Sequence, residues 1–332
     1  MANEPLGCNY SSFAYVILQY GHFNLTVSCI DSIREYTSSN AKIVVVDNCS
    51  PDDSLKLLEK KFGGDSNIKV VATQNNLGFS SGNNLGFSVA KKEWNPRFIV
   101  VLNSDIELTQ MTFESKIEAA YNDCRFGVLG PDIYIPSRKR HQNPFAICDD
   151  ALHPNDPSIQ GVEEARSSLL NELNGVTNQE LAELTKKEIF KSSFVGNFLV
   201  ELKHQIQDLK HEVRFRHEYK SRVNDVALQG ACFVFSRQFM QRFELPFTPE
   251  TFLYCEEMLL RINCKEANLL MVFDPSIKVL HFEGSSTDSI DSVSKKKFIN
   301  REILKSLDVV ERRLATDSNN TGKNRQRIVN EC

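Results

Sequence analysis

The segment around Asp47 places a carboxylate and an amide directly after an apolar run, Ile43 to Val46. In a parallel sheet, the crevice that binds ligands lies outside the carboxyl ends of the strands. There Asp47 could accept a hydrogen bond from the imide N–H of a uracil or thymine base, and Asn48 or Ser50 could add another. A turn followed by a helix N-cap explains the same residues equally well.

A loop rich in glycine and asparagine, residues 73–84, follows the next apolar run. Its glycines, Gly78 and Gly82, allow close backbone approach, while Asn76 and Asn83 can bind the edges of a sugar or a base. The loop does not end in Gly-Lys-Ser/Thr and does not match the dinucleotide fingerprint. It therefore indicates a sugar or nucleotide site only in combination with other segments.

Asn103, Ser104 and Asp105 follow a third apolar run, residues 98–102. One carboxylate beside two neutral polar groups can hold Mg²⁺ or Mn²⁺ when substrate phosphates and water fill the remaining positions. The plainer interpretation is an aspartate that caps the end of a strand. A metal site here therefore needs a second ligand from elsewhere in the chain.

Adjacent acids, Glu256 and Glu257, stand at the expected start of a helix after an aromatic and apolar stretch. Either carboxylate could act as a general base if its pKa is modestly raised beside an acceptor hydroxyl. Acids are also favoured at helix N-termini by the helix dipole, without any catalytic role.

A final polar segment begins at His281, which ends a strand-like run. His281 could be the second protein ligand of the ion, and Ser285, Ser286 and Thr287 could hold phosphate oxygens. A purely structural histidine is the commoner explanation of such a residue taken alone.

Elements that alternate between strand and helix patterns must position these residues. Continuous apolar strands in such an alternation predict a mostly parallel, doubly wound α/β sheet. The expected strands are residues 13–18, 43–47, 68–72, 98–102 and 127–130, and the expected helices are 25–36, 54–62, 82–90 and 112–121.

The strand pattern stops at residue 136 and returns at residue 227. The intervening residues predict an inserted helical subdomain or lid, with helices at 162–173, 180–190 and 198–213. The later expected elements are strands at 227–235, 269–273 and 278–281 and helices at 237–242 and 256–267. We therefore divide the chain into 1–135, 136–226, 227–288 and 289–332, the last being a helix and a mobile tail.

Composition narrows the class of protein. With 332 residues and 41% hydrophobic content, the chain can bury a core without a disulfide or metal. A net charge of −4 argues against a nucleic-acid partner. Nine cysteines without a Cys-X-X-Cys pair favour a reducing compartment, and neither a signal peptide nor a membrane span is visible. We expect a cytoplasmic protein, and its lysine cluster at 295–297 could bring it to the inner face of the membrane.

Taken together, the five segments resemble glycosyltransferase family 2, particularly its rhamnosyltransferase-like branch for O-antigen or capsule synthesis. The resemblance covers residues 14–135 and 228–287, in the patterns Val-Asp-Asn-X-Ser, Asn-X-Gly-Phe-X-X-Gly-Asn-Asn, Leu-Asn-X-Asp, Gly-Ala-Cys-Phe, Tyr-X-Glu-Glu and His-X-Glu-Gly-Ser-Ser-Thr. It implies a GT-A nucleotide-diphospho-sugar transferase fold. The donor would be a UDP- or dTDP-linked sugar and the acceptor a glycan or lipid-linked glycan.

The resemblance also implies roles for single residues. Asp47 is similar to the aspartate that reads the base, Asp105 to the last residue of the Asp-X-Asp metal motif, and His281 to a late contact with the metal or pyrophosphate. Glu257 is similar to the catalytic base, which would invert the anomeric configuration by direct displacement with Mg²⁺ or Mn²⁺. The implied nucleotide-sugar contacts are Tyr20, Asp47, Asn48, Asn76, Gly78, Asn83 and Ser104.

Several departures from the family pattern leave alternatives open. Asn103 replaces the first aspartate of the metal motif, and Glu257 is one methylene longer than the usual base, so Glu256 could take its place. A non-catalytic subunit of a polysaccharide complex remains one rival. A sugar nucleotidyltransferase is another, although residues 15–24 lack the glycine-rich loop and lysine expected of it.

Overall fold

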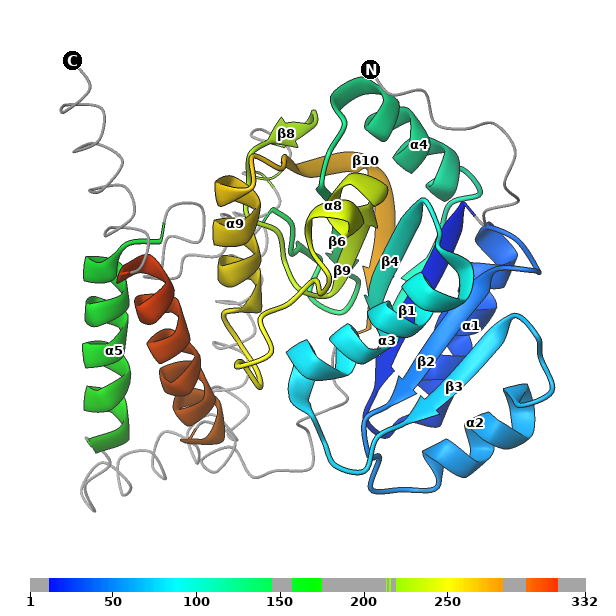
Figure 1. The fold of residues 1–332 in the computed structure, drawn as a ribbon, viewed down its shortest axis with the longest axis horizontal. Helices are drawn as coiled ribbons and strands as arrows, with labels where there is room; N and C mark the ends of the chain where they lie inside the picture. The colour runs from blue at the N-terminus through cyan, green and yellow to red at the C-terminus, as the bar shows by residue number, and fades with distance from the viewer. Residues whose placement is uncertain are drawn as a thin grey trace, which may run out of the picture.

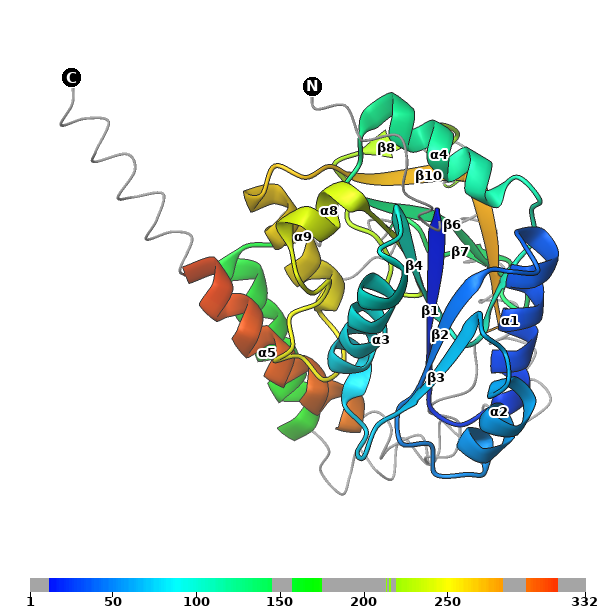
Figure 2. The ribbon, with the colours of Figure 1, turned by 45° about the vertical axis from the view of Figure 1, so that its right-hand side comes forward.

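The computed structural model describes residues 12–144, 157–174, 213, 215, 219–282 and 297–315. Over these residues the chain forms a mixed sheet with helices on both faces (Figures 1 and 2). The strands are β1 (Phe13–Gln19), β2 (Lys42–Asp47), β3 (Ile68–Ala72), β4 (Phe98–Asn103), β5 (Ile106–Leu108), β6 (Val128–Ile135), β7 (Arg140–His141), β8 (Val223–Asn224), β9 (Cys232–Ser236) and β10 (Met271–His281).

Helices α1, α2 and α4 cover one face of the sheet, and α3, α8 and α9 cover the other (Figure 2). Their bounds are α1 (Phe23–Tyr36), α2 (Ser54–Phe62), α3 (Gly78–Trp94), α4 (Phe113–Cys124), α5 (Ile159–Asn174), α8 (Arg237–Arg242) and α9 (Glu256–Glu266). A further helix spans residues 297–315. No helix in the described part of the chain is both long enough and apolar enough to cross a bilayer.

The strands run in the order β3-β2-β1-β4-β9-β6-β10-β5. The first four are parallel, so their carboxyl ends share one edge of the sheet. β9 is antiparallel to β4 and to β6, and β10 is parallel to β6. The carboxyl ends of β6 and β10 and the start of β9 therefore reach the same edge.

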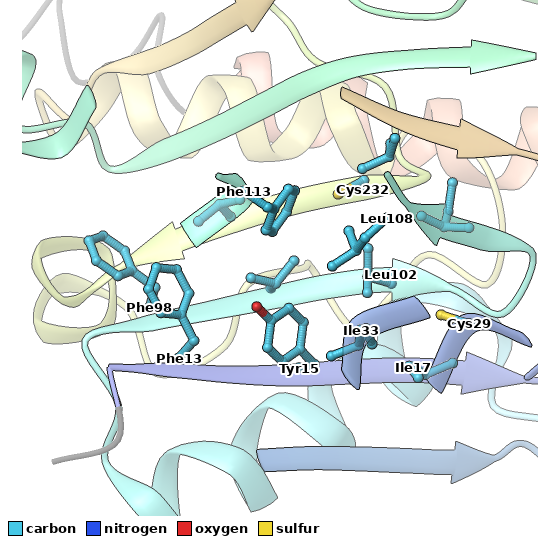
Figure 3. Packing of buried hydrophobic residues seen from close by; sticks show 14 of the residues in the cluster. Phe13, Tyr15, Ile17, Cys29, Ile33, Phe98, Leu102, Leu108, Phe113 and Cys232 are labelled. Carbon is cyan, nitrogen blue, oxygen red and sulfur yellow. The ribbon is translucent and has the colours of Figure 1, made fainter. Parts of the chain in front are cut away.

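Strict alternation of side chains explains why both faces of the sheet are buried. In β1, Phe13, Tyr15 and Ile17 enter the core beneath α1, α2 and α4, whereas Ala14 and Val16 enter the core beneath α3. Figure 3 shows the first of these cores. Strands that are apolar on both sides require helices on both sides, as in other α/β sheets.

A third apolar cluster lies outside the sheet, between α9, α5 and the helix at 297–315. The latter two helices lie side by side beyond α9 in both ribbon views (Figures 1 and 2). Arg166 of α5 joins them through ion pairs with Asp308 and Glu311. Residues near the end of the chain are thus packed against α9.

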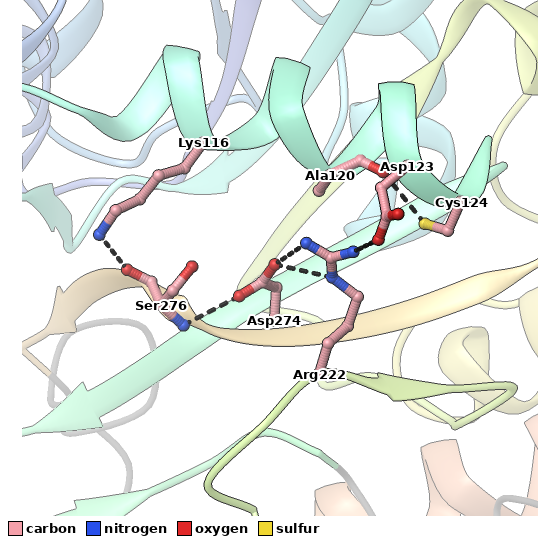
Figure 4. Close-up of polar contacts among 7 residues, drawn as sticks. All are labelled: Lys116, Ala120, Asp123, Cys124, Arg222, Asp274 and Ser276. Atoms are coloured by element: carbon pink, nitrogen blue, oxygen red, sulfur yellow. Dashed lines mark hydrogen bonds and ion pairs between the residues drawn. The ribbon is translucent and has the colours of Figure 1, made fainter.

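A polar network around Asp274 connects the middle of β10 to α4 (Figure 4). Arg222 contacts Asp274 through Nε at 2.9 Å and Asp123 through a second nitrogen at 2.5 Å. The backbone N–H of Ser276 donates to the other Asp274 oxygen at 2.9 Å, and Lys116 donates to the Ser276 carbonyl at 2.5 Å. This network links α4 to the irregular middle of β10.

The structure confirms the expected α/β class with a largely parallel, mixed sheet, and it corrects several elements. Residues 136–226 are not free of strands, because β7 pairs with β6 and β8 with β10. The strands expected at 269–273 and 278–281 are one strand, β10, whose register shifts between Asp274 and Lys278. β9 begins five residues later than the predicted start at 227, since residues 227–231 form a loop.

Other expectations lie outside the described residues. These are the helices at 180–190 and, apart from residue 213, at 198–213, the residues Ser285, Ser286 and Thr287, the first two lysines of 295–297, and the tail from 317 onward. The helix predicted at 162–173 is confirmed as α5.

Candidate active site

The predicted site residues lie on the loops and strand ends at one edge of the sheet. Asp47 ends β2, His281 ends β10, and Ser104 and Asp105 directly follow β4. Tyr20 directly follows β1, whose last residue pairs with Asp47. Parallel strand polarity thus brings together residues that are far apart in the sequence.

Asp47 is buried, and both of its carboxylate oxygens accept hydrogen bonds from neighbouring residues. Its Oδ2 accepts hydrogen bonds from Gln19 Nε2 at 2.8 Å and from the Ser50 hydroxyl at 2.6 Å, while Oδ1 accepts from the Ser50 N–H at 3.0 Å. The Ser50 hydroxyl oxygen in turn accepts from the N–H of Gly21 at 2.7 Å. The carboxylate therefore joins the loops after β1 and β2, and Oδ1 retains one further acceptor position.

Asn48 closes the loop that follows β3. Its side-chain nitrogen donates to Asn76 Oδ1 at 2.9 Å and to the Gly78 carbonyl at 3.1 Å, and its oxygen accepts from the Leu77 N–H at 2.8 Å. Only 3% of Asn48 is exposed. The structure thus shows Asn48 holding the glycine-rich loop, with Asn76 exposed on that loop.

Gly78 joins this loop to Phe252, in the segment that precedes α9. Its φ of 74° is in the left-handed region, and a Cβ here would lie 2.2 Å from the carbonyl oxygen of Phe252. The next residue, Phe79, donates its N–H to that same carbonyl at 2.7 Å. Glycine is required here by both the backbone conformation and the close approach.

The remaining predicted nucleotide-sugar contacts differ in exposure. Tyr20 is 38% exposed beside the Asp47 loop, and Ser104 is 9% exposed. Asn83 lies inside α3, fully buried, with its side-chain nitrogen bonded to the Phe79 carbonyl at 3.0 Å and its oxygen without a described partner. Asn83 is therefore part of the packing beneath the loop rather than of its exposed surface.

Asp105 and His281, the two residues predicted to bind a metal ion, lie close together. His281 Nε2 lies 3.2 Å from Asp105 Oδ1, and the Phe282 N–H donates to the Asp105 carbonyl at 2.9 Å. The other ring nitrogen, Nδ1, lies 2.6 Å from Gln142 Oε1. β10 thus brings an imidazole to the carboxylate that follows β4.

The donor set of this pair fits a divalent cation. The amide oxygen of Gln142 can only accept a hydrogen bond, so Nδ1 of His281 must donate to it. In a neutral imidazole, Nε2 then has no proton and presents its lone pair toward the Asp105 carboxylate. A cation between the two atoms, or a second ring proton, makes that contact favourable. Within the described residues, no group of three or more His, Cys, Asp or Glu side chains surrounds a metal position.

Glu257 lies in the first turn of α9 and faces the start of β9. Its Oε1 accepts the N–H of Gly230 at 3.1 Å, and a Cβ on Gly230 would lie 2.5 Å from that oxygen. The following residue, Ala231, accepts the N–H of Asn103, two residues before Asp105. Glu257 is therefore at the same edge as the Asp105–His281 pair, and burial raises its pKa.

Glu256 has a different environment. It is 3% exposed, and its Oε1 has no hydrogen-bond partner among the described residues. Burial, and then the charge of Glu257, raise its pKa well above the usual carboxyl range. Two carboxylates in one helical turn repel each other, and burial disfavours the charged form of each. Glu256 is therefore the acid that is expected to keep its proton beside Glu257.

The turn before α9 has an uncommon backbone. Tyr254 and Cys255 have φ values of 71° and 65°, although neither is glycine. Non-glycine residues in the left-handed region cost of order 1 kcal/mol each and persist where the surrounding structure holds them. The turn therefore stores strain immediately before the two glutamates.

Two residues of the site were not predicted. Gln142 lies in residues 136–226, where no pattern indicated a function, and it reaches His281 because β7 pairs with β6. Gln19 ends β1, pairs with Asp47 in the sheet and donates a hydrogen bond to it. Its place at the end of a strand next to the Asp47 strand was the feature of the sequence that could have indicated this contact.

Residues 16–161 match the profile of Glycosyl transferase family 2. Glycosyltransferase GlyG of Streptococcus pneumoniae serotype 4 is 29% identical over 106 residues, which are 32% of this chain and 33% of GlyG. The chain thus spans about a third of the length of this curated relative.

Two solved structures are similar at low identity. GalNAc-T7 with UDP, GalNAc and Mn²⁺ gives a TM-score of 0.49 at 14% identity, over 83% of this chain and 44% of that chain. S. aureus TarS 1-349 in complex with UDP gives 0.48 at 12% identity, over 82% and 61%. The part of the chain that is similar to glycosyltransferase family 2 thus includes the strand ends that carry Asp47 and Asp105.

Proposed function

We propose that this protein transfers a sugar from a nucleoside-diphosphate donor to a hydroxyl of a glycan acceptor, with inversion at the anomeric carbon. The observation that carries the proposal is the convergence of Asp105, His281 and Glu257 at one edge of the sheet. Two groups suited to a cation and one carboxylate with a raised pKa are what metal-assisted direct displacement requires.

Glu257 is the general base in this proposal. Its Gly230 hydrogen bond fixes one carboxyl oxygen, which leaves the other to accept the proton of the attacking acceptor hydroxyl. The raised pKa makes Glu257 a stronger base than an exposed glutamate. Glu256 lacks such an anchor at the β9 loop, and we assign it no role in proton transfer.

Asp105 and His281 would hold the divalent cation, with the Gln142 amide orienting the imidazole from its far side. When bound, this cation neutralises charge on the leaving diphosphate. A ligand set that includes an imidazole favours Mn²⁺ over Mg²⁺, because Mg²⁺ prefers oxygen ligands.

The donor would lie over the loops that follow β1, β2 and β3. Asp47 would read a uracil or thymine imide through the free acceptor position on Oδ1, and the exposed ring of Tyr20 would cover the base. Asn76 and Ser104 would contact the nucleotide sugar. Asn48 and Asn83 would act indirectly, by fixing the loop that Gly78 opens.

The acceptor that we propose is a glycan or lipid-linked glycan of a bacterial surface polysaccharide, as the rhamnosyltransferase-like resemblance implies. A cytoplasmic location with contact at the inner membrane face, through the 295–297 cluster, belongs to the same proposal.

The test is a screen of UDP-, dTDP- and GDP-linked sugars with Mn²⁺, using mass spectrometry to detect nucleoside diphosphate release and transfer to glycan acceptors. We expect turnover with a UDP or dTDP donor, and a product whose anomeric coupling in NMR is opposite to that of the donor. Retained configuration would contradict direct displacement. Binding of UDP without turnover of any donor would favour the non-catalytic alternative.

A further inference from the structure

The strained turn before α9 is contacted by the helix at 297–315. The Ser306 hydroxyl donates to the Leu253 carbonyl at 2.8 Å, one residue before the two left-handed residues Tyr254 and Cys255. Ser306 is 2% exposed. Residues near the end of the chain thus supply a buried hydrogen bond to the backbone that leads into Glu256 and Glu257.

A buried acid, Glu302, lies on the same helix and close to this turn. Glu302 is 7% exposed, and its Oε1 lies 2.6 Å from Nζ of Lys305. The pKa of the Tyr254 phenol is raised by burial and further by the charges of Glu256 and Glu302, which places all three groups within electrostatic reach.

Apolar packing fixes α9 from the same side. Met258, Leu259 and Ile262 of α9 share one cluster with Leu307 and Val310 of the later helix. Glu257 contacts Gly230 of the β9 loop instead. The position of Glu257 relative to the β9 loop therefore depends on how the helix at 297–315 holds the start of α9.

Strain in the turn makes such a support necessary. Two adjacent left-handed non-glycine residues relax toward ordinary backbone angles unless the surroundings prevent it. Relaxation at 254–255 would turn the first residues of α9, and the Gly230–Glu257 hydrogen bond would lengthen. A carboxylate that must meet a hydroxyl is sensitive to displacements of about 1 Å.

We propose that Ser306 is a positioning residue for Glu257, acting through its hydrogen bond to the Leu253 carbonyl on the strained turn. The proposal rests on the proposed function, because it assigns Glu257 to the transfer step. It also makes the helix at 297–315 part of the active-site support, although this helix lies outside the residues that match the family.

The experiment compares Ser306→Ala with Ser306→Thr, which keeps the hydroxyl, and with Arg166→Ala as a matched control. Arg166→Ala removes the ion pairs to Asp308 and Glu311, which attach the helix to α5, and leaves the contact between Ser306 and the turn in place. Two quantities are measured in the full chain: hydrogen exchange of the 252–257 backbone, and kcat with KM for the UDP or dTDP sugar found by the donor screen.

For Ser306→Ala we expect exchange at 252–257 to rise about fivefold, which corresponds to the loss of one neutral hydrogen bond. We expect kcat to fall between about 10-fold and 100-fold while the donor KM stays within about twofold. Ser306→Thr should restore both quantities. Arg166→Ala should lower the melting temperature without changing kcat.

Two results would overturn the proposal. Unchanged exchange and unchanged kcat in Ser306→Ala would show that the hydroxyl does not hold the turn. A loss of kcat in Arg166→Ala equal to that in Ser306→Ala would show a general loss of stability instead of positioning. If the wild-type protein turns over no donor, the proposed function fails, whereas faster exchange in Ser306→Ala would still establish the support of the turn.

Discussion

Two regions of this protein bury carboxyl groups, and they differ in whether the carboxyl oxygens have hydrogen-bond partners. In the middle of β10, Asp274 is 4% exposed and accepts hydrogen bonds from Arg222 and from the Ser276 N–H (Figure 4). In the first turn of α9, Glu256 is 3% exposed, and its Oε1 has no described partner.

The difference shows which buried acids serve stability and which are available for chemistry. A buried carboxylate that is paired and hydrogen-bonded stays ionised and links its neighbours. Buried acids without a cation nearby have raised pKa values and cost stability, and such groups are concentrated at functional sites. Burial raises the pKa of both glutamates at α9, whereas Asp274 is paired with Arg222.

The largest expected effect is on catalysis, through Glu257→Gln. Removing the base while keeping the size of the side chain should lower kcat about 10²- to 10⁴-fold. Affinity for UDP should remain, because the hydrogen bond that Glu257 accepts comes from Gly230 of the β9 loop. Turnover assays and calorimetric titration with UDP measure the two effects separately, and wild-type turnover in this variant would remove Glu257 from the mechanism.

The next effect is on stability, through Arg222→Ala. It leaves Asp274 buried without its cation, which should lower the free energy of unfolding by about 2 kcal/mol, less than for a fully buried pair because 28% of the Arg222 side chain is exposed. Urea unfolding measures the change. The kcat of the folded variant should equal that of the wild type.

Asp123→Asn is the matched control for that prediction. The Asp123 side chain is 73% exposed and meets the same arginine, so its loss should cost less than about 0.5 kcal/mol. Equal losses from Arg222→Ala and Asp123→Asn would show that Asp274 does not need the pair.

A smaller effect than that of Arg222→Ala, and in the opposite direction, is expected from Glu256→Gln. Because the folded protein raises the pKa of Glu256, it binds this proton more tightly than the unfolded chain does. The native state therefore loses stability as pH rises above the unfolded carboxyl pKa. The amide should stabilise the protein by about 1 kcal/mol at pH 8, with the difference shrinking toward pH 4.

Thermal unfolding across this pH range measures the gain from Glu256→Gln. A loss of stability at pH 8 would contradict the assigned environment of Glu256. Loss of turnover in this variant, with Glu257→Gln active, would transfer the role of base to Glu256.

Much of the fold could be predicted because its strands are continuous and apolar. The runs at β2, β3 and β4 and the helical periods of α1 and α2 each have one simple explanation, and strand polarity then places Asp47 and Asp105 at one edge. The weaker predictions concerned short elements. β7 and β8 are two residues long, too short for a period, and they form only because β6 and β10 offer edges.

The sequence indicated where the candidate site residues lie better than it indicated which way their side chains point. Asp105 and His281 were expected to meet, and they lie 3.2 Å apart. Asn48 and Asn83 were expected to face a ligand, yet both are buried and bond to backbone. A polar residue at a strand end can bind a ligand or close a loop with equal ease, and only the fold decides between them.

The support of α9 by the helix at 297–315 could not be predicted at all. Its hydrogen bond joins the Ser306 hydroxyl to the Leu253 carbonyl, 53 residues apart in the sequence. No motif marks Ser306, because a serine within a helix can face solvent or bond to its own helix without any further role.

The central claim is that Asp105 and His281 form the cation and diphosphate site of a glycosyltransferase. Its most direct test is the melting temperature with UDP, with and without Mn²⁺, in the wild type and in Asp105→Ala. A ligand that binds only the native state must raise this temperature. We predict a Mn²⁺-dependent rise of several degrees in the wild type and in Glu257→Gln, and none in Asp105→Ala. An undiminished rise in Asp105→Ala would contradict the claim.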